Sequence, residues 1–88
     1  MSRYMYRYEV LVDERKHTFY LTSGPEHVAA PDDNHVEFWA EFEEGKPSYQ
    51  RAFRVFGTGH ELPDEAAWVG TCPRTRNGFV WHLYEVAP

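Results

Sequence analysis

The 88-residue sequence has few of the residues from which disulfides and metal sites are built. It has one cysteine, Cys72, which has no partner for an intramolecular disulfide and no companion at the spacing of a metal site. Its five histidines include no pair at i, i+2 or i, i+4. We therefore expect no metal site and no cofactor, and we expect Cys72 to be a small buried hydrophobic residue rather than a nucleophile.

Positive charge is also scarce. Nine Lys and Arg residues stand against 14 Asp and Glu residues, which gives a formal net charge of −5. Binding to duplex nucleic acid depends on cationic contacts to phosphates, so we do not expect duplex nucleic acid as a partner. The sequence also lacks the apolar run of a signal peptide and the roughly 20 apolar residues of a membrane span, so we expect no membrane partner and a cytoplasmic location.

Aromatic side chains and alternating patterns are what the sequence has in abundance, since Trp, Tyr and Phe make up 17% of it. Apolar and polar residues alternate along several segments, most clearly from Val36 to Glu43, and no window shows sustained helical periodicity. We predict strands over residues 4–12, 17–21, 27–30, 36–43, 51–56, 68–71 and 79–86. This pattern predicts a single, mostly β domain over residues 1–88, a small antiparallel barrel or sandwich of six to seven short strands.

Two of the connections carry specific turn signals. Pro63 suits a helix start, so residues 64–67 are expected to form one helical turn. The pair Asn77-Gly78 is favoured in type I′ hairpins, so we predict such a turn before the last strand. Small β domains must also pair or cover the edges of their sheets, which favours a homodimer.

The segment best suited to binding is Gly57-Thr58-Gly59-His60, which follows a predicted strand that carries Arg51 and Arg54. Two glycines spaced by one residue let backbone N–H groups approach a small anion, although the rest of a dinucleotide fingerprint or P-loop is missing. The alternative is a loop that only caps the strand, with His60 as its hydrogen-bonding brace. The candidate ligand-binding residues are Arg54, Gly57, Thr58, Gly59, His60 and, on the last strand, His82. Aromatic residues for stacking a ring are Phe56, Trp81 and Tyr84.

A second candidate surface is acidic. Residues 17–45 contain seven acids and no Lys or Arg, and Glu37 and Glu41 alternate with core positions of the clearest strand, with Trp39 between them. We take Trp39, Glu37 and Glu41 as candidate partner-binding residues, with a solvated face that keeps the chain soluble as the alternative.

Three stretches, Gln50–Pro63, Val69–Thr71 and Phe79–Glu85, together resemble a family of small tailed-bacteriophage proteins of unknown function. The similar features are an arginine-led strand, Gly-Thr-Gly-His, a nearby proline, a Gly-Thr strand and a final His-x-aromatic-Glu strand. The segment Val36–Ala40 is similar to a Trp-Ala stretch of that family. The chain departs from the family in residues 72–76 and in its acidic content between residues 32 and 44. The resemblance implies a phage-encoded accessory protein and brings no known activity, cofactor or catalytic residue.

We accordingly predict a non-enzymatic phage accessory protein of the host cytoplasm that binds a small anionic, nucleotide-like ligand or a host factor. Counter-defence is its most concrete role, and no catalytic residue is predicted. Two alternatives stay open: an inhibitor of a host protein that acts through the Trp39 face, and a small hydrolase that uses His60, with His82, as acid and base. A minor component of the virion is a further possibility.

Overall fold

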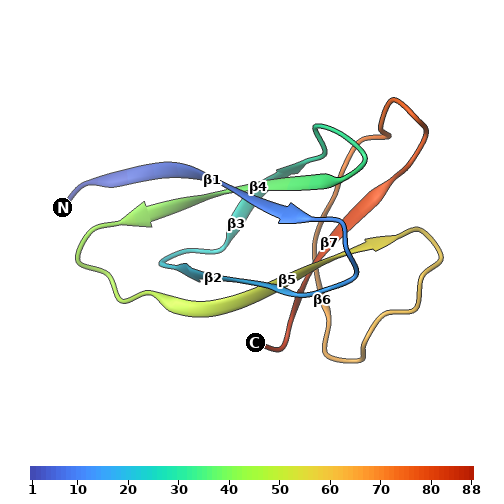
Figure 1. Cartoon of the computed structure of the whole chain (residues 1–88). Helices are drawn as coiled ribbons and strands as arrows, with labels where there is room; N and C mark the ends of the chain where they lie inside the picture. The colour runs from blue at the N-terminus through green and yellow to red at the C-terminus, as the bar shows by residue number, and fades with distance from the viewer.

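The computed structural model describes residues 1–88 and contains seven β-strands and no helix (Figure 1). The strands are β1 (Arg3–Leu11), β2 (His17–Leu21), β3 (Pro25–Ala29), β4 (His35–Glu43), β5 (Tyr49–Gly57), β6 (Ala67–Thr71) and β7 (Trp81–Val86). The predicted mostly β fold is confirmed. The chain has no helix long and apolar enough to cross a membrane.

The strands form two antiparallel sheets that make a small sandwich. One sheet has the order β1-β4-β3 and the other the order β2-β5-β7-β6. Although β1 and β2 follow one another in the chain, the turn between them carries the chain from the first sheet to the second. Strands β1, β5 and β6 finish at the same end of the sandwich, so the loops that follow them gather there (Figure 1).

The core lies between the sheets and is dominated by aromatic rings. Strand β4 buries every second residue, as its alternating sequence requires, and Phe38 is fully buried at its middle. The ring of Phe38 lies 4.9 Å from that of Tyr8 on β1, 5.4 Å from that of Phe19 on β2 and 4.9 Å from that of Phe53 on β5. These contacts join both sheets, so the aromatic content of the sequence is used largely for its core.

The sandwich is closed along one side and open along the other. On the closed side β3 and β6 approach so closely that a Cβ built on Gly70 would lie 2.6 Å from a methyl carbon of Val28. On the open side, Tyr4 and Tyr6 at the start of β1 face inward but extend beyond the core and stay exposed. The Tyr4 ring stacks on that of Tyr6, and the Tyr6 ring stacks on Phe42 of β4, with centroids 5.8 Å apart in each pair.

Two of the predicted turns are different in the structure. Residues 64–67 form no helical turn: the Ala66 N–H donates to the Pro63 carbonyl at 3.1 Å, which closes a single β-turn before β6. The Asn77-Gly78 hairpin is not type I′, because only Gly78 has a positive φ, at 91°. With a hydrogen bond from the Gly78 N–H to the Thr75 carbonyl, it is a type I turn followed by a left-handed glycine.

Candidate functional site

The Gly57–His60 segment forms a tight turn at the end of β5. The His60 N–H donates to the Gly57 carbonyl at 3.2 Å, and Gly59, at the third position, has a φ of 88°. A positive φ at that position is characteristic of a type II turn and favours glycine. Gly59 is therefore needed for backbone conformation, whereas Gly57 has an ordinary φ and needs another explanation.

The imidazole of His60 lies on Gly57 and accepts a hydrogen bond from it. The Gly57 N–H donates to His60 Nδ1 at 3.1 Å, and a Cβ at residue 57 would lie 2.9 Å from His60 Cε1. With Nδ1 as the acceptor, Nε2 is the ring nitrogen left to donate a hydrogen bond. The ring thus braces its own loop, and it occupies one of the backbone N–H groups expected to receive an anion.

His82 is held in a similar way between two threonine hydroxyl groups. Its Nε2 lies 2.8 Å from Thr58 Oγ1 and its Nδ1 lies 2.9 Å from Thr71 Oγ1. The indole N–H of Trp68 also donates to Thr71 Oγ1, at 3.0 Å. Since a neutral imidazole has one donor and one acceptor, the two hydroxyl groups satisfy both nitrogens. Thr58, expected as a ligand contact, therefore links the loop to β7 and β6.

Arg54 has a different environment from the other arginines of the strands. Its guanidinium carbon lies 4.5 Å from the centre of the Phe56 ring, and the Phe56 ring in turn meets Tyr84 edge to face at 5.5 Å. Arg54 Nε is buried and has no hydrogen-bond partner. Asp33 Oδ1 and Trp81 Nε1 are buried without a partner in the same way. Arg54 takes part in no side-chain hydrogen bond or ion pair and lines a cleft, so the terminal N–H groups of its guanidinium can donate to a ligand or water oxygen.

Arg51, expected beside Arg54 as a contact for an anion, is already paired. Strand alternation places it on the opposite face of β5, where Nε and Nη2 each donate to Glu85 at 2.8 Å. These hydrogen bonds raise the pKa of Arg51 above its usual value. A bidentate arginine–carboxylate pair is both geometrically specific and strong, so Arg51 stabilises the pairing of the inner strands β5 and β7 and is not available to a ligand.

The stacking surface predicted from Arg54, Phe56, Trp81 and Tyr84 is only partly assembled. Arg54, Phe56 and Tyr84 meet on the outer face of the second sheet. Trp81 faces the other way, toward the inner layer, where its ring stacks at 5.4 Å on Phe79. Strand alternation explains the separation, because Trp81 and Leu83 share a face that His82 and Tyr84 do not.

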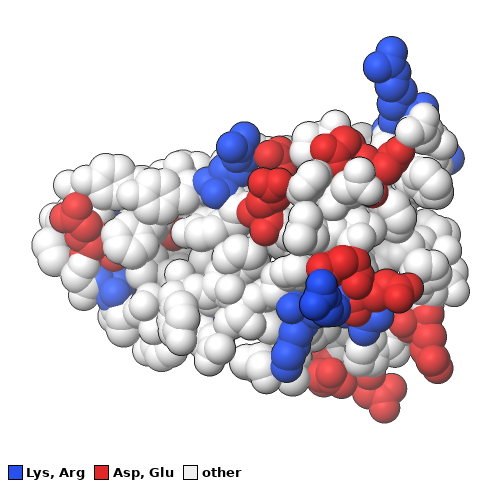
Figure 2. All heavy atoms as spheres, in the orientation of Figure 1, with Lys and Arg blue, Asp and Glu red and all other residues white.

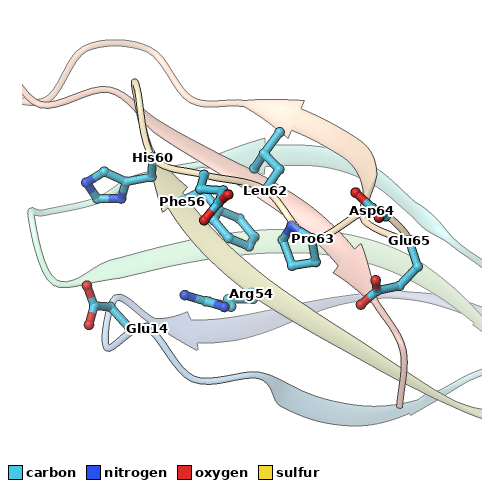
Figure 3. Close-up of a pocket in the computed structure, with 9 residues that line it drawn as sticks. Glu14, Arg54, Phe56, His60, Leu62, Pro63, Asp64 and Glu65 are labelled. Atoms are coloured by element: carbon cyan, nitrogen blue, oxygen red, sulfur yellow. The ribbon is translucent and has the colours of Figure 1, made fainter.

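A cleft of about 650 Å³ opens over Arg54 at the loop end of the sandwich. Figure 3 shows Arg54 and Phe56 on β5, with Glu14 on one side and the chain segment of Asp64 and Glu65 on the other. Hydrophobic Leu62 and polar His60 come from the loop above β5. The complete lining is Glu14, Arg54, Phe56, His60, Glu61, Leu62, Pro63, Asp64 and Glu65.

None of the four carboxylate residues around this cleft was among the binding residues predicted from the sequence. Glu14 reaches it from the β1–β2 turn, where Glu14 itself has a φ of 64°, unusual for a residue with a side chain. The turn is fixed by Asp13, whose carboxylate accepts from the Arg15 N–H at 3.0 Å and pairs with His17 Nε2 at 2.8 Å. No sequence signal relates Glu14 to Arg54, because they lie 40 positions apart, Glu14 in the β1–β2 turn and Arg54 on β5.

The acidic surface is more nearly balanced in charge than the sequence indicates. Arg7 Nη1 lies 3.3 Å from Glu37 and Arg3 Nη1 lies 3.3 Å from Glu41, because β1 pairs with β4. Trp39 is half-buried, and its ring lies 5.4 Å from the His27 ring of β3. Positive and negative side chains also adjoin one another on the face of the molecule seen in Figure 2. The carboxylates of Glu37 and Glu41 on the Trp39 face are therefore each paired with an arginine.

The remaining reactive side chains have structural surroundings. Cys72 is buried at the end of β6, and burial raises the pKa of its thiol to about 11, which keeps it protonated and unreactive at neutral pH. No group of three or more His, Cys, Asp or Glu side chains is arranged to hold a metal ion. The carboxylate partners of histidines are found at His17 and His35, not at His60 or His82.

Fold and cleft together define an all-β, two-sheet domain with an open, polar cleft over a single arginine. The chain belongs to the family described as "Domain of unknown function (DUF7352)", whose family model matches residues 1–88. No curated protein and no solved structure matches the chain.

Proposed function

We propose that the protein is a non-enzymatic binding domain that holds a small molecule in the cleft over Arg54. The observation that carries this proposal is the guanidinium of Arg54, which lies over Phe56, lines the cleft and takes part in no side-chain hydrogen bond or ion pair within the protein. Stacking on an aromatic ring fixes the plane of the guanidinium, so its N–H groups point in set directions. An anionic oxygen of a ligand in the cleft can accept charge-assisted hydrogen bonds from these N–H groups.

The lining limits the ligand to about one negative charge. Four carboxylates surround the cleft, those of Glu14, Glu61, Asp64 and Glu65, against the one guanidinium. Several like charges lining one cleft disfavour a polyanion such as a nucleoside triphosphate. The same carboxylates accept hydrogen bonds from hydroxyl and amino groups, which a nucleoside carries. A cyclic nucleotide or a phosphodiester, with one charge for each phosphate, suits this lining better than a triphosphate.

The biological setting is proposed from the sequence. The Arg51–Pro63 segment and the last strand resemble small tailed-phage proteins, and this supports a phage-encoded accessory protein of the host cytoplasm. Sequestration of a nucleotide-derived immune signal is a role that needs binding without turnover. It is consistent with a site that offers donors and acceptors but no nucleophile activated by a base.

The two alternative functions have less support. Hydrolysis through His60 and His82 requires a free acid and base, whereas Nδ1 of His60 and both ring nitrogens of His82 already take part in hydrogen bonds within the protein. Inhibition of a basic host protein through the Trp39 face requires free carboxylates, whereas Glu37 and Glu41 are paired with arginines. Each alternative therefore requires existing contacts to break first.

The proposal is tested by thermal unfolding of the protein with two nucleotide probes. Adenosine 3′,5′-cyclic monophosphate carries one negative charge and adenosine triphosphate carries about four. Ligand at ten times its dissociation constant stabilises the folded state by about 1.4 kcal/mol, which corresponds to roughly 5–10 °C in a domain of this size. We expect 1 mM cyclic mononucleotide to raise the midpoint and 1 mM triphosphate to leave it unchanged.

Matched variants make the test specific. Arg54→Gln keeps the side-chain stem over Phe56 and removes the charge, so it should abolish the shift. Arg76→Ala removes an exposed arginine of the β6–β7 loop outside the cleft and should keep it. A larger shift with the triphosphate, or an equal shift in Arg54→Gln, would contradict the proposed site.

A further inference from the structure

Strand β1 has one edge that is not used within the chain. It lies at the edge of its sheet and pairs only with β4. The bonds at both ends of this ladder, from the Glu44 N–H to the Ser2 carbonyl and from the Val12 N–H to the Asn34 carbonyl, involve even-numbered residues of the β1 segment. In an antiparallel ladder alternate residues bond to the same neighbour, so the odd-numbered residues of β1 direct their N–H and C=O groups outward.

The outward edge lies next to exposed apolar side chains. Tyr4, Met5 and Tyr6 are 43%, 51% and 45% exposed, although Tyr4 and Tyr6 are on the face of β1 that points into the sandwich. At the left of Figure 2, where Figure 1 places the start of β1, white atoms surround smaller acidic and basic patches. An unprotected edge of this kind is a template for pairing with another strand.

The residues of β1 are complementary to a second, antiparallel copy of β1. If the twofold axis passes through Tyr6, Arg3 faces Glu9 of the other copy and Glu9 faces its Arg3, while Tyr4 faces Tyr8. Within the chain Arg3 also lies 3.3 Å from Glu41 and Glu9 lies 3.3 Å from His35, so the cross-strand pairs extend existing surface ion pairs. Odd-numbered residues then face odd-numbered residues, so the free N–H and C=O groups of both edges pair in one ladder. Opposite charges and aromatic residues are favourable cross-strand pairs.

Neighbouring registers are less favourable. An axis through Met5 places Arg3 opposite Arg7, and an axis through Arg7 places the two copies of Arg7 opposite one another; both juxtapose like charges. An axis through Tyr8 pairs Arg7 with Glu9, but it leaves the exposed Tyr4 uncovered.

We propose that the protein forms a homodimer through the outer edge of β1, with the twofold axis at Tyr6, so that two three-stranded sheets become one six-stranded sheet. The partner is a second copy because the edge is complementary to itself in both charge and hydrogen bonding. This surface does not include the residues that line the cleft over Arg54, so the dimer and the ligand site are tested separately.

The first test is the mass of the protein in solution, by light scattering after size exclusion. The chain has a mass of 10.4 kDa, and we expect the wild-type protein to be a species of twice that mass. Met5→Pro removes an N–H that the monomer does not use and puts a proline on an edge strand, where proline is tolerated. This variant should keep the circular dichroism spectrum of the wild type and have the monomer mass. A wild-type monomer at millimolar concentration, or a folded Met5→Pro dimer, would overturn the proposal.

The second test fixes the register without depending on the proline variant. Directly opposed residues of a non-hydrogen-bonded pair have Cα atoms about 4.5 Å apart, within the range of a disulfide. Tyr6→Cys should therefore give a disulfide-linked dimer on mild oxidation, whereas Tyr8→Cys and the wild-type protein, whose Cys72 is buried, should not. Linkage through Tyr8→Cys alone, or no linkage in Tyr6→Cys, would overturn the proposed register.

Discussion

The close approach of β3 and β6 predicts that Gly70→Ala lowers the stability of the wild-type protein but raises that of a Val28→Ala variant. In Gly70→Ala the new Cβ lies 2.6 Å and 3.2 Å from the two methyl carbons of Val28, whereas carbon atoms in contact are about 3.5–4.0 Å apart. Val28 is 8% exposed, and its branched side chain has little rotational freedom, so the strands must separate.

The magnitude follows from two opposing terms. Overpacking of a buried site costs about 1–3 kcal/mol, and replacement of a strand glycine by alanine returns about 0.5–1 kcal/mol of backbone entropy. We therefore expect Gly70→Ala to lower the free energy of unfolding by about 1–2 kcal/mol, a fall in melting temperature of roughly 5–15 °C. In a Val28→Ala background the obstructing methyl groups are absent, so the same change should stabilise by about 0.5–1 kcal/mol.

Urea unfolding of the four proteins, followed by tryptophan fluorescence and far-UV circular dichroism, measures this cycle. The interaction free energy between the two substitutions should exceed about 1 kcal/mol, well above the additivity expected of independent sites. Equal effects of Gly70→Ala in both backgrounds would show that β3 and β6 do not close the sandwich as described.

Three further results are expected. Gly57→Ala should displace the His60 ring and break the hydrogen bond from the residue 57 N–H to Nδ1, which lowers the free energy of unfolding by about 0.5–1.5 kcal/mol. The same substitution should be stabilising in a His60→Ala background. Identical effects in the two backgrounds would show that His60 does not brace this loop. Hydrogen bonding to Asp32, with the charges of Asp32, Glu9 and Glu37, raises the pKa of His35 above 6.5, so its contribution to stability is complete below pH 6.5 and is lost as the pH rises through the raised pKa. The stability difference between wild type and His35→Gln should accordingly shrink between pH 6 and pH 8, and a difference that grows would refute this. Cys72, buried and with its pKa raised to about 11, should react with a thiol reagent only at the rate of unfolding; rapid reaction under native conditions would place it outside the core.

The strands were largely predictable because their signal is local. Alternation along Val36–Phe42 indicates a half-buried strand whatever its neighbours are, and β2 lies at the predicted residues, His17–Leu21. The turn at Gly78 was assigned to the wrong type, because the sequence Asn-Gly permits a left-handed residue at either position and only the geometry of the hairpin selects one.

The candidate site was less predictable because its chemistry depends on contacts between distant residues. Arg51 and Arg54 look equivalent in the sequence, yet alternation puts one against Glu85 and the other over Phe56. The sequence predicts His60 as a ligand contact, but in the structure its Nδ1 accepts a hydrogen bond from the Gly57 N–H. The carboxylates that set the charge of the cleft come from two separate loops, and nothing local relates those loops to Arg54.

The most direct measurement of the central claim is analysis of what the protein carries from the cell. The wild-type protein and Arg54→Gln are expressed in bacteria that accumulate immune nucleotides, purified, and heated to release bound molecules for mass spectrometry. We predict one nucleotide-like ion with a single charge for each phosphate, released in stoichiometric amount from the wild type and absent from Arg54→Gln. Equal release from both proteins, or none from the wild type under saturating conditions, would contradict a ligand site over Arg54.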